Sequence, residues 1–314
     1  MKRILILHYS QTGQLTRAVK SMTAPLENCK DFELTWQNMT PKKPYPFPWS
    51  ILEFFDVFPE SVYMDPPEME AVDFDPDEKF DLIILAYQVW FLSPALPVTG
   101  FLNSKDARVL KDTPVITFIA CRGMWLSAQE KMKSTLAKLG ARLIDNVVLV
   151  DQGPQWATFV TMPLWMLTGK KIGFAGLIPP AGVSDKDINE ASRFGRAIAA
   201  SLNKLEPGLK SPLLKGLGAV KVNAKYIGGE KIVHRSFHIW GKLFRAVGGP
   251  GHPMRKPLLI IYIMFLITMI LTAMPIGAIF RAIMRPLIRN KLDRQVKVYE
   301  EPSGSSTDRM KGYV

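Results

Sequence analysis

Cysteine is scarce in this chain, and so is net charge in its first two thirds. The 314 residues include only two cysteines, Cys29 and Cys121, too few for the disulfide framework of a small secreted domain. The chain begins Met1-Lys2-Arg3 and runs straight into a short apolar stretch, without the length or small-residue cleavage site of a signal peptide. These absences favour a reducing, cytoplasmic setting for this part of the chain.

The net charge of +12 belongs to the end of the chain. Residues 201–314 hold 19 Lys and Arg against 6 Asp and Glu, whereas residues 1–200 hold 21 against 22. A basic tail of this kind binds nucleic acid or an anionic membrane surface. Here the basic residues bracket an apolar segment and do not alternate with aromatic residues along a polar face, which disfavours nucleic acid.

An uncharged stretch of 24 residues lies between Lys256 and Arg281. As a helix it would reach about 36 Å, at about 1.5 Å per residue, and a hydrocarbon core is about 30 Å thick. Basic residues flank both ends, against the positive-inside tendency of a single span, and Pro275 and Gly277 interrupt the stretch. We therefore predict a membrane helix over residues 257–280, and leave open whether it spans the bilayer or inserts on one face.

Five segments are predicted along the chain. They are an α/β domain over 1–202, a basic linker over 203–256, the membrane helix over 257–280, a basic interfacial segment over 281–302 and a disordered tail over 303–314.

The first 200 residues alternate between apolar runs and helix-like patterns. Strands are predicted over 2–8, 32–37, 82–87, 114–120 and 144–150, and helices over 16–26, 95–103, 127–139 and 187–202. Continuous apolar strands are typical of parallel sheets covered by helices on both faces. The pattern predicts the α/β class, with a doubly wound, five-stranded parallel sheet whose ligand lies at the carboxyl ends of the strands.

Two long connections exceed what this minimal fold needs. Residues 41–70 are rich in proline and aromatic residues, and residues 151–184 contain several more aromatic side chains. Each is interpreted as a connection packed on the domain surface, with the alternative that one or both line a lipophilic pocket or touch a bilayer.

A polar loop follows the first predicted strand and precedes the first predicted helix. It consists of Ser10, Gln11, Thr12, Gly13, Gln14, Leu15 and Thr16. Hydroxyl groups and unpaired backbone N–H groups at the start of a helix form a binding site for a phosphate. The loop lacks the Gly-Lys-Ser/Thr ending of a nucleotide-triphosphate loop and the spaced glycines of a dinucleotide fingerprint. It predicts a phosphate site, with an ordinary capped turn as the alternative.

Two further loops follow the third and fourth predicted strands. The first contains Gln88, Val89, Trp90, Phe91 and Leu92, and the second contains Cys121, Arg122, Gly123 and Met124. Aromatic rings in the first can stack on a planar ligand, and Gly123 permits a close approach of the backbone.

Other polar residues are weaker candidates. His8 is interpreted as structural, and His234, His238 and His252 lack the spacing of metal ligands, so no metal site is predicted. Cys121 has no His or Asp partner nearby in the sequence, which disfavours a nucleophilic role.

With these three loops in order, the chain as far as Leu202 resembles the flavodoxin-like FMN reductases, the superfamily of NAD(P)H:quinone reductases and flavodoxins. Their phosphate loop usually reads Ser/Thr-x-Thr-Gly. The resemblance implies that the three loops bind FMN, and that Arg122 lies near the flavin edge, where it would stabilise the reduced anion. The domain departs from electron-carrier flavodoxins, which are strongly acidic, because it is nearly neutral.

The whole chain is also similar to bacterial proteins labelled dialkylresorcinol condensing enzymes. This resemblance depends on residues 87–94, on Ile178-Pro179-Pro180-Ala181 and on the apolar tail. It implies a place in lipid or dialkylresorcinol biosynthesis.

These expectations combine into a membrane-attached FMN oxidoreductase at the cytoplasmic face of the inner membrane. It would use NAD(P)H to reduce a lipophilic acceptor, either a quinone or an aromatic lipid intermediate. The alternative is a non-catalytic flavodoxin-like module tethered to the membrane. Membrane lipids and a lipophilic small molecule are the expected partners, and a homodimer is left open.

Overall fold

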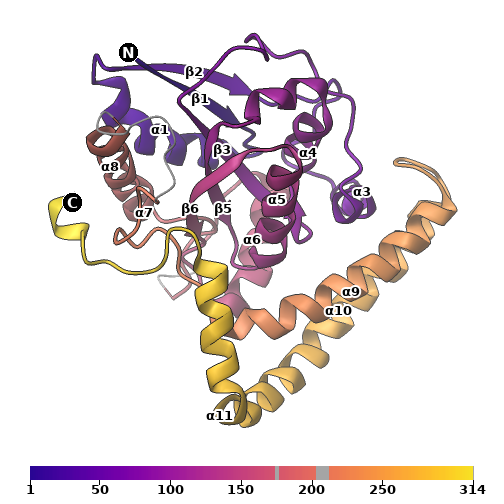
Figure 1. Ribbon diagram of the computed structural model, residues 1–314. Helices are drawn as coiled ribbons and strands as arrows, with labels where there is room; N and C mark the ends of the chain where they lie inside the picture. Colours follow the sequence, from indigo (N-terminus) through magenta and orange to yellow (C-terminus); the bar gives the residue numbers. More distant parts are fainter. Residues whose placement is uncertain (174–176, 203–211, 314) are drawn as a thin grey trace.

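The computed structural model describes residues 1–173, 177–202 and 212–313, with only the backbone at positions 278, 281, 282 and 285. At its centre is a parallel sheet (Figure 1). The strands are β1 (Lys2–His8), β2 (Phe32–Asn38), β3 (Leu82–Trp90), β5 (Pro114–Cys121) and β6 (Arg142–Val150), joined by the two-residue β4 (Ser93–Pro94), which pairs antiparallel with β3.

The parallel strands lie in the order β2-β1-β3-β5-β6. Counted as five parallel strands, this is the 2-1-3-4-5 order of the flavodoxin-like doubly wound sheet, which confirms the predicted fold class. The apolar runs explain the parallel arrangement: Ile4, Leu5, Ile6 and Leu7 are all fully buried, so both faces of β1 are covered.

Helices cover the two faces of the sheet (Figure 1). On one face are α1 (Gln14–Glu27), α7 (Asp185–Glu190) and α8 (Ser192–Leu202), and on the other are α4 (Leu96–Asn103), the 3₁₀ turn η1 (Lys105–Leu110) and α5 (Leu126–Lys138). The helix predicted over 187–202 is two helices. Gly195 brings α8 close to α1, since a Cβ atom there would lie 1.8 Å from the carbonyl oxygen of Met22.

Both long connections fold into helices. The first carries α2 (Ile51–Asp56), which begins with a capping box between Ser50 and Glu53, and α3 (Phe58–Tyr63). The second carries α6 (Gln155–Thr168).

The predicted basic linker is structured where the structure describes it. Residues 203–211 lie outside the described part, but Leu213, Leu214 and Leu217 are buried in the core of the α/β domain. The predicted domain boundary at residue 202 therefore falls short of the end of this core. After it comes α9 (Ala224–Val247), a helix of 24 residues.

The uncharged stretch is not one helix. Its residues fall into α10 (Arg255–Leu271) and α11 (Ala273–Glu300), with a break at Thr272. The break has a local cause: Pro275 has no N–H group to donate to the carbonyl of Leu271, and its ring would clash with that carbonyl in a continuous helix. In the described part of the chain no helix is both long and apolar enough to cross a membrane. The prediction of one helix over residues 257–280 is wrong, because the chain breaks at Thr272.

The helices α9, α10 and α11 form an arm beside the α/β domain (Figure 1). The chain runs out along α9, returns along α10, and turns sharply into α11, which leads back to the domain. Arg255 fixes the base of α10. Its side chain is 1% exposed, and its guanidinium donates to Glu60 at 2.7 Å and to the Gly248 carbonyl at 2.8 Å. This arginine, predicted as a basic flank of the membrane helix, instead forms a buried ion pair with α3.

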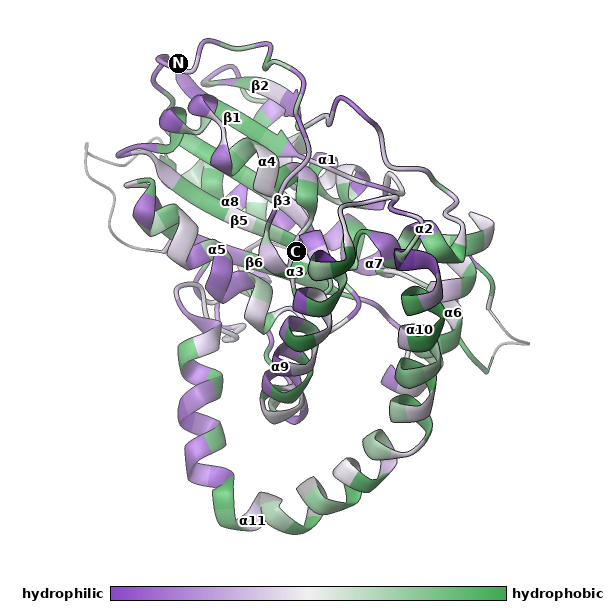
Figure 2. Ribbon diagram, turned by 90° about the vertical axis from the view of Figure 1, so that its right-hand side faces the viewer, coloured by the Kyte–Doolittle hydropathy of each residue, from purple (hydrophilic) through white to green (hydrophobic). Residues whose placement is uncertain are grey.

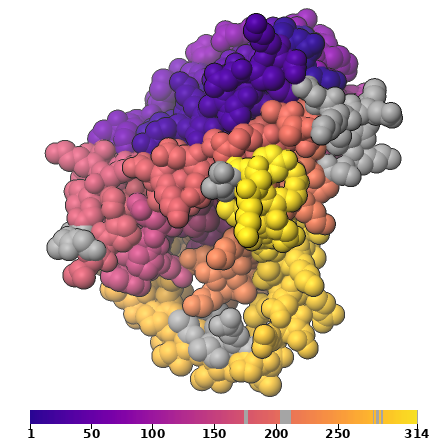
Figure 3. Space-filling view, turned by 90° about the vertical axis from the view of Figure 1, so that its left-hand side faces the viewer, coloured from indigo at the N-terminus to yellow at the C-terminus, as the bar shows by residue number. Residues whose placement is uncertain are grey.

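The C-terminal residues are not disordered where the structure describes them, up to residue 313. Ser303 is fully buried, its hydroxyl donates to Asp145 at 2.7 Å, and it accepts from the Asn146 backbone N–H at 2.7 Å. Arg309 N–H donates to the Gly216 carbonyl at 2.9 Å, and the segment includes the short turn η2 (Met310–Gly312). Figure 3 shows this segment, in yellow, lying on the α/β domain.

The burial of Asp145 makes stability depend on pH, and the bond from Ser303 limits the effect. Burial raises the pKa of Asp145 to about 6, and the Ser303 hydroxyl opposes that rise by donating to the carboxylate. Because the folded pKa lies above that of an unfolded aspartate, the stabilising contribution of this group is present at acid pH and is lost as pH rises through about 6. We expect Ser303→Ala to enlarge that loss, lowering the free energy of unfolding by roughly 1–2 kcal/mol more at pH ~8 than at pH ~5. Urea titrations at the two pH values measure the difference, and an equal decrease at both would contradict it.

Candidate functional site

Three of the predicted loops lie together at one edge of the sheet. The strands β1, β3 and β5 are neighbours and parallel, so the loops after them, at 9–13, 88–92 and 121–124, share the carboxyl edge. The first two are directly joined, because the backbone N–H of Gln11 donates to Oε1 of Gln88 at 2.8 Å. This is the edge at which ligands bind in doubly wound sheets.

The first loop presents unpartnered polar groups. Within the described residues, Ser10 Oγ and Thr12 Oγ1 are buried and have no hydrogen-bond partner. Gly13 precedes the first turn of α1 with φ of +76°, and no side chain caps this helix end. A buried hydroxyl without a partner costs about 1–3 kcal/mol, so two beside an uncapped helix start indicate that a ligand's acceptor atoms complete the loop. The donor set fits a phosphate.

Three other predicted residues of this loop, Gln14, Leu15 and Thr16, contact the rest of the protein and hold the loop in place. The Gln14 side chain bonds the backbone of Val183 twice, at 3.0 and 3.1 Å, and Leu15 is fully buried in the core. Thr16 Oγ1 lies 3.3 Å from Nδ1 of His8, whose pKa burial lowers, so this imidazole is neutral at pH 7. None of these three side chains is free to hold a ligand.

The second loop is a tight hairpin. Val89 pairs with Pro94 and Trp90 with Ser93, which leaves Phe91 and Leu92 in the turn with φ of 47° and 61°. A two-residue type I′ turn needs positive φ at both turn positions, and Asn-Gly is the usual pair because other side chains are strained there. The strain therefore lies at the position where the aromatic residues leave the sheet.

The hairpin sends its two aromatic side chains in different directions. Trp90 contacts the rings of Tyr9, Tyr45 and Trp49 with centroids 5.1–5.9 Å apart. Phe91 packs against Phe54 and Phe58 instead, toward α9 and α10. Of the two stacking candidates, Trp90 is the one beside the phosphate loop, because Tyr9 directly precedes Ser10.

Arg122 is the charged group of the third loop. Its Nε donates to Thr158 at 2.7 Å and its guanidinium lies 3.8 Å from the ring centre of Phe159, while its two Nη atoms have no partner within the described residues. Burial lowers the pKa of Arg122 to about 10, so the side chain stays charged at pH 7. Burial also raises the pKa of the Cys121 thiol, which keeps it protonated and a poor nucleophile.

Helix α9 covers this third loop, which the sequence did not indicate. A Cβ atom on Gly123, where φ is +151°, would lie 3.3 Å from the Tyr226 hydroxyl. Glu230, 1% exposed, holds the helix in place by accepting from the backbone N–H groups of Leu126 and Ser127 at the start of α5. Met124 is half-buried beside them.

The connection over 151–184 closes over the first loop. Asp151 accepts from the backbone N–H groups of Gly153 at 2.7 Å and Gly182 at 2.6 Å. Gly182 is next to Val183, the partner of Gln14, so this connection is fastened to the start of α1. Such long-range bonds leave no signal in the sequence.

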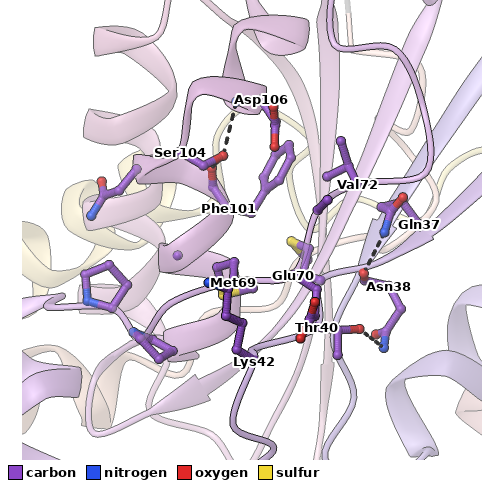
Figure 4. A pocket seen from close by; sticks show the side chains of 16 residues that line it. Gln37, Asn38, Thr40, Lys42, Met69, Glu70, Val72, Phe101, Ser104 and Asp106 are labelled. Carbon is purple, nitrogen blue, oxygen red and sulfur yellow. Dashed lines mark hydrogen bonds between the residues drawn. The ribbon is translucent and has the colours of Figure 1, made fainter.

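A separate cavity of about 520 Å³ lies between the end of β2 and α4 (Figure 4). Met69, Glu70 and Phe101 are among its lining residues, and none of its lining residues belongs to the three loops. In the described part of the chain, no group of three or more His, Cys, Asp or Glu side chains could hold a metal ion.

The strand order of the sheet decides the fold. It is flavodoxin-like. Solved structures similar to this chain include a flavodoxin from the domain Archaea, 13% identical, covering 65% of this chain and 99% of its own, with a TM-score of 0.37. A flavoprotein in complex with FMN from Lactobacillus acidophilus NCFM is 20% identical and covers 47% of this chain and 93% of its own, with a TM-score of 0.38.

A flavodoxin, WrbA-like protein from Agrobacterium tumefaciens is 10% identical, with a TM-score of 0.35, and covers 66% of this chain and 100% of its own. No protein-family model and no curated protein matches the chain. The fold assignment therefore depends on the strand order of the sheet.

Proposed function

We propose that this chain is a membrane-attached FMN oxidoreductase that accepts hydride from NAD(P)H and reduces a lipophilic acceptor. The observation that carries the proposal is the pair of buried, unpartnered hydroxyls of Ser10 and Thr12 beside the uncapped start of α1. FMN has a single phosphate, which these hydroxyls and the first-turn N–H groups of α1 would bind.

The residues around that loop have distinct parts in this proposal. FMN, when bound, supplies the hydride and electron transfer between nicotinamide and acceptor. Trp90 would flank the ring system and exclude water. Arg122 would hold a positive charge near the ring edge, since its pKa of about 10 keeps it protonated at pH 7 and its Nη atoms have no partner within the described residues.

Membrane attachment is proposed through the turn between α10 and α11. Figure 2 shows that the end of α10 and the start of α11, mostly apolar (green), project away from the α/β domain, and that α11 continues into a hydrophilic arm. Apolar side chains more than half exposed gather around this turn: Met264, Ile267, Leu271, Ile276, Ile279, Phe280, Ile283 and Leu287. Apolar surface of this extent is a feature of interaction sites with membranes or proteins.

The charges that follow favour a membrane over a protein partner. The exposed basic residues Arg289, Lys291, Arg294 and Lys297 come directly after the apolar turn on α11. An apolar surface next to basic residues matches the acyl and headgroup layers of an anionic bilayer. Insertion from one side keeps the basic arm at the cytoplasmic face, where NAD(P)H is present.

The flavin part of the proposal is tested by colour and bleaching. We expect full-length protein purified in detergent to be yellow, to bleach with NADH or NADPH without oxygen, and to regain its colour on adding a quinone. A colourless protein that cannot be reconstituted with FMN would contradict the proposal and would favour the alternative of a non-catalytic module. A yellow protein that no quinone reoxidises would point to a dedicated aromatic lipid intermediate as acceptor.

A further inference from the structure

Two buried polar atoms outside the phosphate loop have no partner and lie among aromatic rings. Trp49 Nε1 and Tyr262 Oη are unpartnered within the described residues, on side chains that are 4% and 0% exposed. Leaving a buried N–H or O–H group unpaired destabilises a fold, and each such group calls for an explanation. Both groups can donate a hydrogen bond to an oxygen atom of a ligand.

A continuous series of rings joins these two residues to the candidate flavin site. We call it the aromatic path, and its members are Trp90, Trp49, Phe54, Phe55 and Tyr262. Successive ring centres are 5.9, 5.9, 5.2 and 6.1 Å apart. Apart from Trp49 Nε1, Tyr262 Oη and the indole nitrogen of Trp90, these side chains are hydrocarbon, so a planar lipophilic molecule is the ligand class that suits them.

The two ends of the aromatic path are placed for a membrane-dissolved molecule. At one end Trp90 contacts Tyr9, beside the phosphate loop. At the other end Tyr262 lies on α10, whose opposite face carries Ile260, Ile261 and Met264, each more than half exposed. The path therefore leads from the apolar arm to the edge of the sheet.

The short helix α2 covers the middle of the path. None of its residues is fully buried, and Phe54 and Phe55 belong to it. Its last residue, Asp56, is held by Arg255 at 3.4 Å, and its Leu52 and Phe55 side chains pack against the buried cluster that contains Tyr262. All residues of α2 are partly or fully exposed, whereas the apolar core of β1 is fully buried. Local opening of α2 therefore costs less free energy than unfolding of the sheet, and it can uncover the path.

We propose that the aromatic path is the binding route of the lipophilic acceptor, a planar ring that bears oxygen atoms and an apolar tail. Trp49 donates a hydrogen bond to a ring oxygen at the flavin end, and Tyr262 donates one at the membrane end. This inference depends on the proposed oxidoreductase function, because it says where the acceptor of that enzyme binds.

Two conservative substitutions test the path in full-length protein loaded with FMN. Tyr262→Phe keeps the ring and removes only the hydroxyl, whereas Trp49→Phe keeps an aromatic ring but removes the N–H together with part of the indole. We expect each to raise the KM for decylubiquinone about two- to tenfold, the effect of one lost hydrogen bond. FMN content and turnover with ferricyanide, a water-soluble acceptor that has no need of the path, should be unchanged.

A third variant separates these effects from general damage to the core. Tyr87 is also fully buried, but its hydroxyl donates to Gln129 at 2.6 Å. Tyr87→Phe should therefore lower stability and leave the KM for decylubiquinone unchanged. Tyr262→Phe should leave stability unchanged or raise it, because its hydroxyl has no partner to lose within the described residues. Trp49→Phe should lower stability, because the smaller ring leaves a cavity.

The outcomes distinguish the path from the proposed function. An unchanged KM for decylubiquinone in both variants, or an equal loss of ferricyanide turnover, would overturn the inference while the oxidoreductase stands. If the wild-type protein turns over no acceptor, the proposed function fails. Quenching of tryptophan fluorescence by decylubiquinone then decides the inference: weaker binding in Tyr262→Phe supports the path, and unaltered binding overturns it.

Discussion

Protein carrying both Ser10→Ala and Thr12→Val should bind FMN roughly 10²- to 10⁴-fold more weakly than the wild type. Each hydroxyl would donate to a charged phosphate, such a bond contributes about 1.5–3 kcal/mol, and 1.4 kcal/mol is a factor of ten. Titration of the apoprotein with FMN, followed by quenching of the flavin fluorescence, measures the dissociation constant.

The same double variant should not be less stable as apoprotein. Its two hydroxyls have no partner within the described residues, so their removal breaks no bond and relieves the burial of two polar groups. Thr135→Val is the matched control, because Thr135 donates to the Lys131 carbonyl on α5 and lies outside the three loops. If the double variant binds FMN as tightly as this control, the phosphate is bound elsewhere and the flavin proposal loses its main support.

Leu271→Glu combined with Phe280→Glu should release the protein from membranes, with a fall in vesicle partitioning of about 100-fold or more. The two side chains are 70% and 62% exposed at the turn between α10 and α11. Burial of each apolar side chain in the bilayer is worth about 1.5–3 kcal/mol, and the introduced carboxylates oppose insertion. Flotation with vesicles of phosphatidylcholine and phosphatidylglycerol measures the bound fraction.

A matched variant shows whether position matters. Val298 is also exposed, at 62%, but it lies near the end of α11 where Val296 and Tyr299 pack on the α/β domain. Val298→Glu should partition into vesicles as the wild type does. Salt should weaken the binding of both the wild type and Val298→Glu, because it screens the charges of the basic arm. Equal losses in Val298→Glu and in the double variant would point to a general charge effect and would count against an inserted turn.

The sequence predicted the elements of the sheet well because their signal is local. The run Ile4-Leu5-Ile6-Leu7 is apolar on both faces, and only a strand covered on both sides buries all of it. β1 has the predicted bounds, whereas β3 continues to Trp90, three residues past its prediction. That extension comes from the pairing of Trp90 with Ser93 in the hairpin, a contact that the hydrophobic periodicity of the sequence does not predict.

The predictions failed where distant segments decide the structure. The tail after Ser303 reads as disordered because it is short, polar and rich in serine, yet Asp145 and Gly216 bind it. The break in the uncharged stretch is a different, local case. Pro275 was predicted to interrupt this stretch, but a proline by itself does not decide whether a helix kinks or ends there.

The sequence by itself determined the α/β class, the five parallel strands and the hydroxyl-rich loop at Ser10–Thr12, since propensity and hydrophobic pattern act over a few residues. Only the tertiary structure decided which of the sixteen predicted site residues are free to bind. It ties Gln14 to Val183, turns Phe91 toward Phe58, and leaves Ser10 and Thr12 without partners. Hydrogen-bond satisfaction depends on which groups the folded chain brings together, and most of those partners lie tens of residues away in sequence.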